Sequence, residues 1–185
     1  MNCNTLILQS IDGRCDTSMG GIKRILITNR DNVDTAAIVE ALKGSVDGMI
    51  TSVPMVGDAK FSQWLFRKNT GSYNSSFATD VAIGNTTVTT EVALQFSRAE
   101  ADKRMKIQSA LVSPSVVIVE DMYGAYIFLG LENEVTVTSA TMTSGTQTSD
   151  LSGFNLTFTD IAQELPHFIK TGDGGVDITT LVESI

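Results

Sequence analysis

The sequence predicts a mainly β protein of the α+β class, and three observations carry this prediction. Apolar and polar residues alternate along several segments, as they do on strands that bury one face. Threonine and glycine are plentiful in the 185 residues, whereas charged residues make up only 18% of them. Branched side chains pack well on a pleated sheet, so this composition favours strands. One helical segment, residues 99–111, interrupts the strand pattern and predicts a single principal helix that flanks the sheet.

The N-terminal part of the predicted domain alternates between strands and a short helix. Residues 22–28 read as a strand on which Ile22 and Leu26 face away from Ile25. Residues 34–42 have apolar side chains at helical spacing and predict a short helix. The other elements expected before residue 77 are a strand at 49–56, a strand at 61–67, and a polar loop or hairpin tip at 68–76.

Residues 77–97 predict a long β-hairpin. Alternate side chains from residue 77 to 83 share one face, and so do those from residue 88 to 96. Between these runs, Gly84 and Asn85 suit a two-residue turn, because glycine accepts the positive φ that such turns need. These two residues are therefore expected at the tip of the hairpin.

The principal helix is predicted to begin with a capping box. Ser97 and Glu100 have the spacing at which each side chain satisfies an amide group at the start of a helix. Pro114 ends the helical pattern. Apolar residues within about half of the circumference predict the face that packs on a sheet. These residues are Ala101, Met105, Ile107 and Leu111.

Strands return after the helix. Residues 116–119 form an unbroken apolar run, and Asp121 opens a turn through Gly124 into a second run at 125–129. The last strands expected are residues 134–143 and 154–159, with an exposed low-complexity loop at 144–153 between them.

The chain divides into an N-terminal arm (residues 1–20), a β domain (21–160) and a C-terminal extension (161–185). The arm holds Cys3 and Cys15, whose spacing does not suit a zinc site, and the sequence leaves open whether they form a disulfide. The extension is expected either to dock on a neighbouring subunit or to pack on its own domain. The sequence has no signal-peptide pattern, and no apolar run approaches the ~20 residues that span a bilayer.

Composition and motifs argue against nucleic-acid binding and against catalysis. The net charge of −8 does not suit a protein that neutralises duplex phosphates. His167 lacks a nucleophile motif, and we interpret it as a partly buried or interface side chain. Glu120 and Asp121 are neighbours on a strand, so they point to opposite faces and do not share a ligand. We therefore expect no enzyme, no cofactor and no metal site. A basic cluster on the helix is expected to be solvated or to contact an adjacent subunit: Lys103, Arg104 and Lys106.

Two blocks of the chain carry a family resemblance, namely GGIKRILITNRDNV at residues 20–33 and the stretch from EVALQF to NLTFT at residues 91–159. The second block holds ALVxxxVVIVED, then Gly124, Tyr126 and Gly130, and then Gly153, Phe154, Leu156 and Phe158. In this order, the pieces resemble structural proteins of Bacteroides-infecting phages, including the crAss-like group. The residues after Asp160 depart from that pattern.

The resemblance implies a tail-tube-like β-sandwich or barrel whose copies join edge to edge in a ring. Such a protein would be made in the host cytoplasm and would reside in the virion, in the tail or the portal–tail connector. DNA would pass through the channel of the ring during packaging and ejection. By analogy we expect six copies, with twelve as the rival number, and contacts with other tail or portal proteins. A polar, threonine-lined and acidic channel would repel DNA phosphates and let the genome slide.

We expect subunit contacts at the hairpin tip and at several exposed aromatic positions. Sequence reasoning also allows a different class of function, a β-sandwich adhesin or capsid decoration protein that binds a surface. A hydrolase is the weakest reading, because no carboxylates converge. The candidate interface residues are Gly84, Asn85, Tyr73, Trp64, His167 and Phe168, of which Trp64 suits the core equally well.

Overall fold

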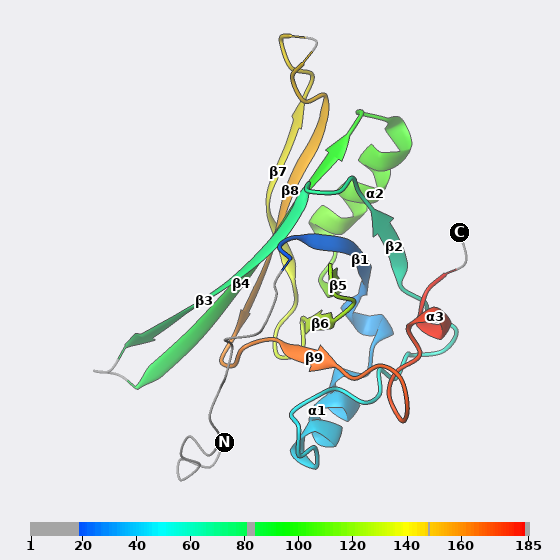
Figure 1. Ribbon diagram of the computed structural model, residues 1–185, viewed down its shortest axis with the longest axis vertical. Helices are drawn as coiled ribbons and strands as arrows, with labels where there is room; N and C mark the ends of the chain where they lie inside the picture. Colours follow the sequence, from blue (N-terminus) through cyan, green and yellow to red (C-terminus); the bar gives the residue numbers. More distant parts are fainter. Residues whose placement is uncertain (1–18, 81–83, 148, 184–185) are drawn as a thin grey trace.

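The computed structural model describes residues 19–80, 84–147 and 149–183. The strands of these residues form two antiparallel sheets that pack face to face as a sandwich (Figure 1). The structure therefore confirms the mainly β, α+β class that the sequence predicts. The N-terminal arm with Cys3 and Cys15 lies outside the described residues, apart from Met19 and Gly20.

The five-stranded sheet has the strand order β2-β1-β5-β6-β9. The strand β5 lies at its centre and is buried along almost its whole length, as its unbroken apolar sequence predicts. The strands β2 and β9 form the two edges. The sheet consists of β1 (Ile22–Asn29), β2 (Ser62–Leu65), β5 (Ser115–Asp121), β6 (Tyr126–Leu129) and β9 (His167–Ile169).

The four-stranded sheet has the strand order β3-β4-β8-β7 and is built from two long hairpins. The ends of these hairpins project beyond the five-stranded sheet in opposite directions (Figure 1). Its edges are therefore the strands β3 and β7. The sheet consists of β3 (Gly71–Asp80), β4 (Asn85–Ser97), β7 (Thr136–Thr143) and β8 (Gly153–Ala162).

The short helix predicted at residues 34–42 is confirmed. Asp34 caps it by accepting a hydrogen bond from the Ala37 N–H at 3.0 Å, and Gly44 follows its last residue. The helical elements are a 3₁₀ turn η1 (Arg30–Asn32), α1 (Thr35–Lys43), α2 (Ala101–Val112) and α3 (Ile178–Leu181).

A first hydrophobic core fills the space between the two sheets. Alternate residues of β4 and β8 point into it, as their sequence pattern predicts, and meet the inward face of β1, β5 and β6. The core includes Ile25, Ile27, Val92, Leu94, Val117, Val119, Ile127, Leu129, Phe154, Leu156 and Phe158.

A second core covers the opposite face of the five-stranded sheet. The helix α1 contributes Ile38, and the C-terminal segment contributes Val176, Ile178 and Leu181. In addition, β9 pairs with β6, so the C-terminal extension packs on its own domain, which is one of the two alternatives left open by the sequence. The sheet residues of this core include Leu26, Phe61, Val116, Ile118, Phe128 and Ile169.

The strand β1 does not alternate as predicted. Ile22 joins Ile25 and Ile27 in the first core, whereas Leu26 points into the second. The cause is an irregularity in the pairing of β1 with β5 between Ile22 and Arg24, which moves Ile22 to the other face.

The helix α2 begins and packs differently from the prediction. It spans Ala101–Val112 rather than residues 99–111, and no side-chain hydrogen bond caps its start, so the predicted capping box does not form. Glu100 pairs instead with Lys103 at 3.1 Å. Ile107 packs against the first core together with Ala110, whereas Met105 is 69% exposed.

Three further predictions need correction. The β3–β4 hairpin is confirmed, but Asn85 pairs with Asp80 and belongs to β4, so Gly84 and Asn85 are not the predicted two-residue turn; residues 81–83 of the predicted run lie outside the described residues. Residues 71–76, expected in a loop or hairpin tip, belong to β3. Residues 49–56 form no strand and make only isolated bridges, because their buried side chains dock singly on the second core.

Candidate functional site

The six predicted interface residues lie in separate parts of the molecule. Gly84 and Asn85 lie together at the exposed end of the β3–β4 hairpin, and the φ of Gly84 is +66°, as predicted for a turn glycine. Tyr73 lies on the edge strand β3 opposite Val92 and is 38% exposed. These three residues belong to the four-stranded sheet or its hairpin end, whereas Trp64, His167 and Phe168 belong to the edge strands of the five-stranded sheet.

Trp64 lies on β2 and belongs to the margin of the first core. Its indole ring makes edge-on contacts with Phe96 at 5.7 Å and with Phe158 at 6.0 Å between ring centroids. These contacts fix the ring from the core side. Of the two readings that the sequence allowed for this residue, the structure places it in core packing, with part of the ring accessible.

His167 and Phe168 are neighbours on the edge strand β9. His167 is half-buried, and its Nδ1 lies 2.9 Å from the carbonyl oxygen of Gly48. Phe168 pairs with Ile127 and is 46% exposed. The histidine therefore ties β9 to the loop after α1, and the phenylalanine is the member of the pair that a partner can reach.

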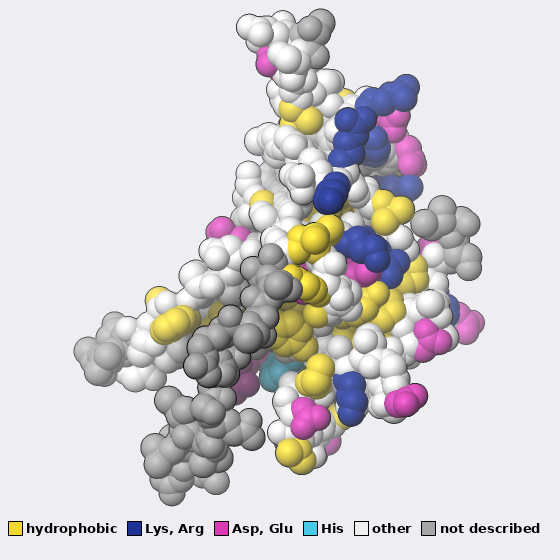
Figure 2. Space-filling model, in the orientation of Figure 1, with side chains coloured by type: hydrophobic (Ala, Val, Ile, Leu, Met, Phe, Trp, Pro, Cys, Tyr) yellow, Lys and Arg dark blue, Asp and Glu magenta, His cyan; other side chains and the backbone are white. Residues whose placement is uncertain are grey.

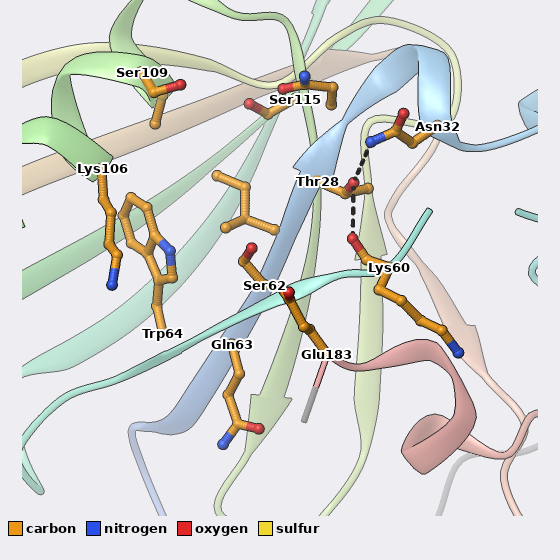
Figure 3. Close-up of a pocket in the computed structure, with 13 residues that line it drawn as sticks. Thr28, Asn32, Lys60, Ser62, Gln63, Trp64, Lys106, Ser109, Ser115 and Glu183 are labelled. Carbon is orange, nitrogen blue, oxygen red and sulfur yellow. Dashed lines mark hydrogen bonds between the residues drawn. The ribbon is translucent and has the colours of Figure 1, made fainter. Parts of the chain in front are cut away.

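A cavity of about 520 Å³ opens between β2 and α2, and sequence reasoning did not find it. Trp64 forms one wall (Figure 3), and hydroxyl and amide side chains from β1, the turn η1, β2 and α2 line most of the remainder. The lining includes Thr28, Asn32, Ser62, Gln63 and Ser109.

The charged groups around this cavity are largely paired. Lys106 forms an ion pair with Asp102 at 2.9 Å, and the ammonium group of Lys60 donates to the carbonyl oxygen of Thr180. Glu183 adds a carboxylate to the lining. The cavity is therefore polar without a strong charge of either sign.

A buried carboxylate holds one end of the five-stranded sheet. Glu120 is 2% exposed and forms ion pairs with Lys23 at 2.7 Å and with Arg24. Arg24 also donates to Gln63 at 3.0 Å and to the Tyr126 hydroxyl at 3.2 Å, so the network crosses four strands. Burial alone would raise the pKa of Glu120, but the hydrogen bonds from Lys23 and Arg24 outweigh it and lower the pKa below its ordinary 4.5.

A second buried carboxylate lies on β8 and is less well paired. Asp160 is 6% exposed, and its Oδ2 accepts a hydrogen bond from the Gly130 N–H at 3.2 Å. Its Oδ1 is buried and has no hydrogen-bond partner among the described residues. Burial, with help from the nearby Glu132, raises the pKa of Asp160 above its ordinary 3.8, against the opposing Gly130 N–H and Arg30 charge.

The outward face of the four-stranded sheet, here called the open face, is nearly uncharged. Within residues 72–78, 87–95, 136–143 and 153–161, strand register assigns one charged side chain to it, Glu91. Lysine and arginine gather instead over α2 and the β1–β2 side of the molecule (Figure 2). The open face consists mainly of Ser72, Asn74, Ser76, Thr87, Thr89, Thr138, Ser139, Thr141, Asn155, Thr157 and Thr159.

Two interpretations made from sequence concern charged residues: the basic cluster on the helix is expected to be solvated, and Glu120 and Asp121 are expected to point to opposite faces of a strand. The structure agrees with both. Lys103 and Lys106 pair with carboxylates of their own helix segment. Asp121 accepts hydrogen bonds from the N–H groups of Tyr123 and Ala125, both at 2.8 Å, and so holds the β5–β6 turn. Among the described residues, no group of His, Cys, Asp and Glu side chains is arranged to hold a metal ion.

No protein-family model, curated protein or solved structure matches the chain. In the part of the chain that the structure describes, the helices are too short or too polar to cross a membrane.

Proposed function

We propose that the chain is a non-enzymatic virion protein that forms a homo-oligomeric ring in a phage tail or portal–tail connector. The observation that carries this proposal is the open face, a long sheet surface of hydroxyl and amide side chains. Within the strand ranges given above, Glu91 is the one charged side chain that points to this face. Such a surface offers DNA phosphates neither cations to bind nor an apolar patch to stick to. A channel lined by it would let DNA slide.

The edges of the four-stranded sheet support assembly into a ring. The strands β3 and β7 lie at opposite edges, so the β3 edge of one copy and the β7 edge of the next could join head to tail. Head-to-tail contacts generate closed rings when the rotation between copies closes. The projecting β3–β4 hairpin also presents Phe77, which is 72% exposed and would be covered by a neighbour.

Negative-stain electron microscopy of the purified protein tests the ring directly. We expect annular particles with six-fold symmetry, and twelve-fold symmetry would favour the connector position. A monodisperse monomer at high concentration would contradict the proposal.

A matched pair of variants tests the hairpin contact. Phe77→Ser should lower the fraction of annular particles, because it removes the exposed ring at the hairpin end. Met105→Ser, at a side chain of similar exposure (69%) on α2, should leave that fraction unchanged. Equal assembly of both variants would place the contact elsewhere.

Added cations test the role of the open face. The double variant Asn74→Lys/Thr141→Lys should bind a fluorescent DNA duplex at low salt, because it places two cations on the open face, and the affinity should fall as the salt concentration rises. The wild-type protein should not hold it at ~0.15 M salt. Salt-dependent binding by the wild type would contradict a sliding surface.

A second candidate function is a β-sandwich adhesin or capsid decoration protein. The cavity beside Trp64 favours this candidate, because a surface-binding module needs a ligand site and a ring subunit does not. Compact monomers or trimers in the same micrographs would shift the assignment to it.

A further inference from the structure

The cavity between β2 and α2 has features that the proposed ring does not use. Its volume of about 520 Å³ falls in the range of small-molecule sites, roughly 300–1,000 Å³. We propose that this cavity binds a short neutral saccharide. The proposal is independent of the ring, since every residue that carries it belongs to one subunit.

Polar side chains in the lining are already oriented by internal hydrogen bonds. The Asn32 amide donates to the Thr28 hydroxyl at 3.0 Å, which leaves the amide oxygen of Asn32 as an acceptor. The hydroxyls of Ser62 and Ser109 also line the cavity, and each can donate and accept a hydrogen bond. One fixed amide acceptor and two hydroxyls suit the hydroxyl groups of a sugar, because each sugar hydroxyl both donates and accepts.

Trp64 supplies the apolar surface that a sugar ring also needs. Its indole is held from the core side by Phe96 and Phe158, so its orientation does not depend on a ligand. In Figure 3 the indole nitrogen is turned toward the lined space, and its N–H has no hydrogen-bond acceptor among the described residues. The indole can therefore contact the C–H groups of a sugar and donate one hydrogen bond to it.

The remaining lining argues against anionic and lipid ligands. Lys60 and Lys106 are engaged by Thr180 and Asp102, and Glu183 would repel a phosphate or an acidic sugar. A lipid would leave the hydroxyl and amide groups of the lining without partners, at a cost for each buried group. The geometry therefore points to a ligand that is polar and uncharged.

The chain offers a direct readout, because Trp64 is its single tryptophan. Maltotriose, cellotriose and N-acetylated chitotriose, all uncharged, should be titrated into the full chain while indole fluorescence and the indole N–H resonance are followed. We expect a saturable change with at least one of these trisaccharides, and none with the anionic 3′-sialyllactose.

A pair of neighbouring substitutions on α2 tests the location. Ser109 lines the cavity, whereas Gln108, also exposed, does not. Ser109→Phe should fill the cavity and weaken binding at least tenfold, while Gln108→Phe should bind as the wild type does. Circular dichroism of both variants checks that each is folded.

Three results would overturn the proposal. The first is the absence of a response to all of the neutral trisaccharides. The second is equal binding by the two phenylalanine variants. The third is a saturable response only to an extended Gly-Ala peptide, which would make the cavity a peptide groove. Because fluorescence reports each subunit separately, these results do not depend on whether the chain forms rings.

Discussion

The five-stranded sheet has an apolar core on each of its faces, whereas the four-stranded sheet has one on a single face. This difference is visible in the strands themselves. All but the last residue of β5 are buried, while β4 alternates between buried and accessible side chains from Val88 to Leu94. The number of covered faces, rather than the direction of pairing, therefore sets the sequence pattern of these antiparallel strands.

The same difference separates two roles within one domain. The five-stranded sheet lies between the four-stranded sheet and the layer of α1 and the C-terminal segment, so its side chains mainly stabilise the fold. The four-stranded sheet holds its place with one face and leaves the open face for other contacts. Substitutions should therefore be costly on the first sheet and, on the open face, nearly neutral.

The largest expected effect is the loss of an aromatic ring from the second core. Phe128 is 1% exposed, so Phe128→Ala should lower the free energy of unfolding by about 3–5 kcal/mol. Ile161→Ala is the matched control, because Ile161 lies on the open face and is 51% exposed. Urea denaturation measures both, and a comparable loss for the control would mean that the open face is covered within the subunit.

The next effect concerns the ionic network at the end of the five-stranded sheet. Glu120→Gln should lower the free energy of unfolding by about 2–3 kcal/mol at neutral pH, because Arg24 is left partly buried without its carboxylate. Lys23 also loses its ion pair with Glu120 in this variant, but because Lys23 is 62% exposed, this loss adds little to the change in the free energy of unfolding.

The pH dependence of this difference has a defined sign. The folded-state pKa of Glu120 is lowered, so its contribution is present above the ordinary value of 4.5 and is lost as pH falls through the folded pKa. The stability gap between wild type and Glu120→Gln should be constant from pH 8 to 5 and shrink in acid. A gap that widens in acid would contradict the ion pairs.

Asp160 should show the opposite sign. Its folded-state pKa is raised, so its ionised form destabilises the fold, and this cost disappears as pH falls through the folded pKa toward the ordinary 3.8. The stability of the wild type relative to Asp160→Asn should therefore increase on acidification. Urea midpoints at a series of pH values measure the trend, and a flat difference would mean that Oδ1 finds a partner in solution.

Most of the sandwich could be predicted from sequence because its strands bury one or two complete faces. Predictions were wrong where that signal is absent. Residues 71–76 of β3 are polar on both faces because they lie on an edge strand, and residues 49–56 are apolar without a strand to pair with along their length. On α2, the predicted Ile107 does reach the first core, but its neighbour there is the small Ala110, whereas the larger Met105 of the predicted face is exposed.

The candidate sites were harder to predict because they unite residues that are distant in sequence. The cavity draws Asn32, Gln63 and Ser109 from three elements, and no spacing motif connects them. Glu120 offered a signal, since a carboxylate at the end of an apolar run needs a buried partner. Its partner Arg24 lies 96 positions away, so sequence did not identify it.

The smallest expected effect distinguishes two threonines of the open face. Thr159 is 8% exposed, and its hydroxyl lies 2.8 Å from that of Thr138, so Thr159→Val should cost about 1 kcal/mol. Thr157 is half-buried and its hydroxyl bonds to no other described residue, so Thr157→Val should change stability by less than about 0.5 kcal/mol. If both variants lost equal stability in urea denaturation, the open face would be packed in the isolated subunit and the contrast between the two sheets would fail. If Thr157→Val is neutral both for stability and for ring formation, the hydroxyl surface is needed neither within the subunit nor between copies, as the proposed channel lining requires.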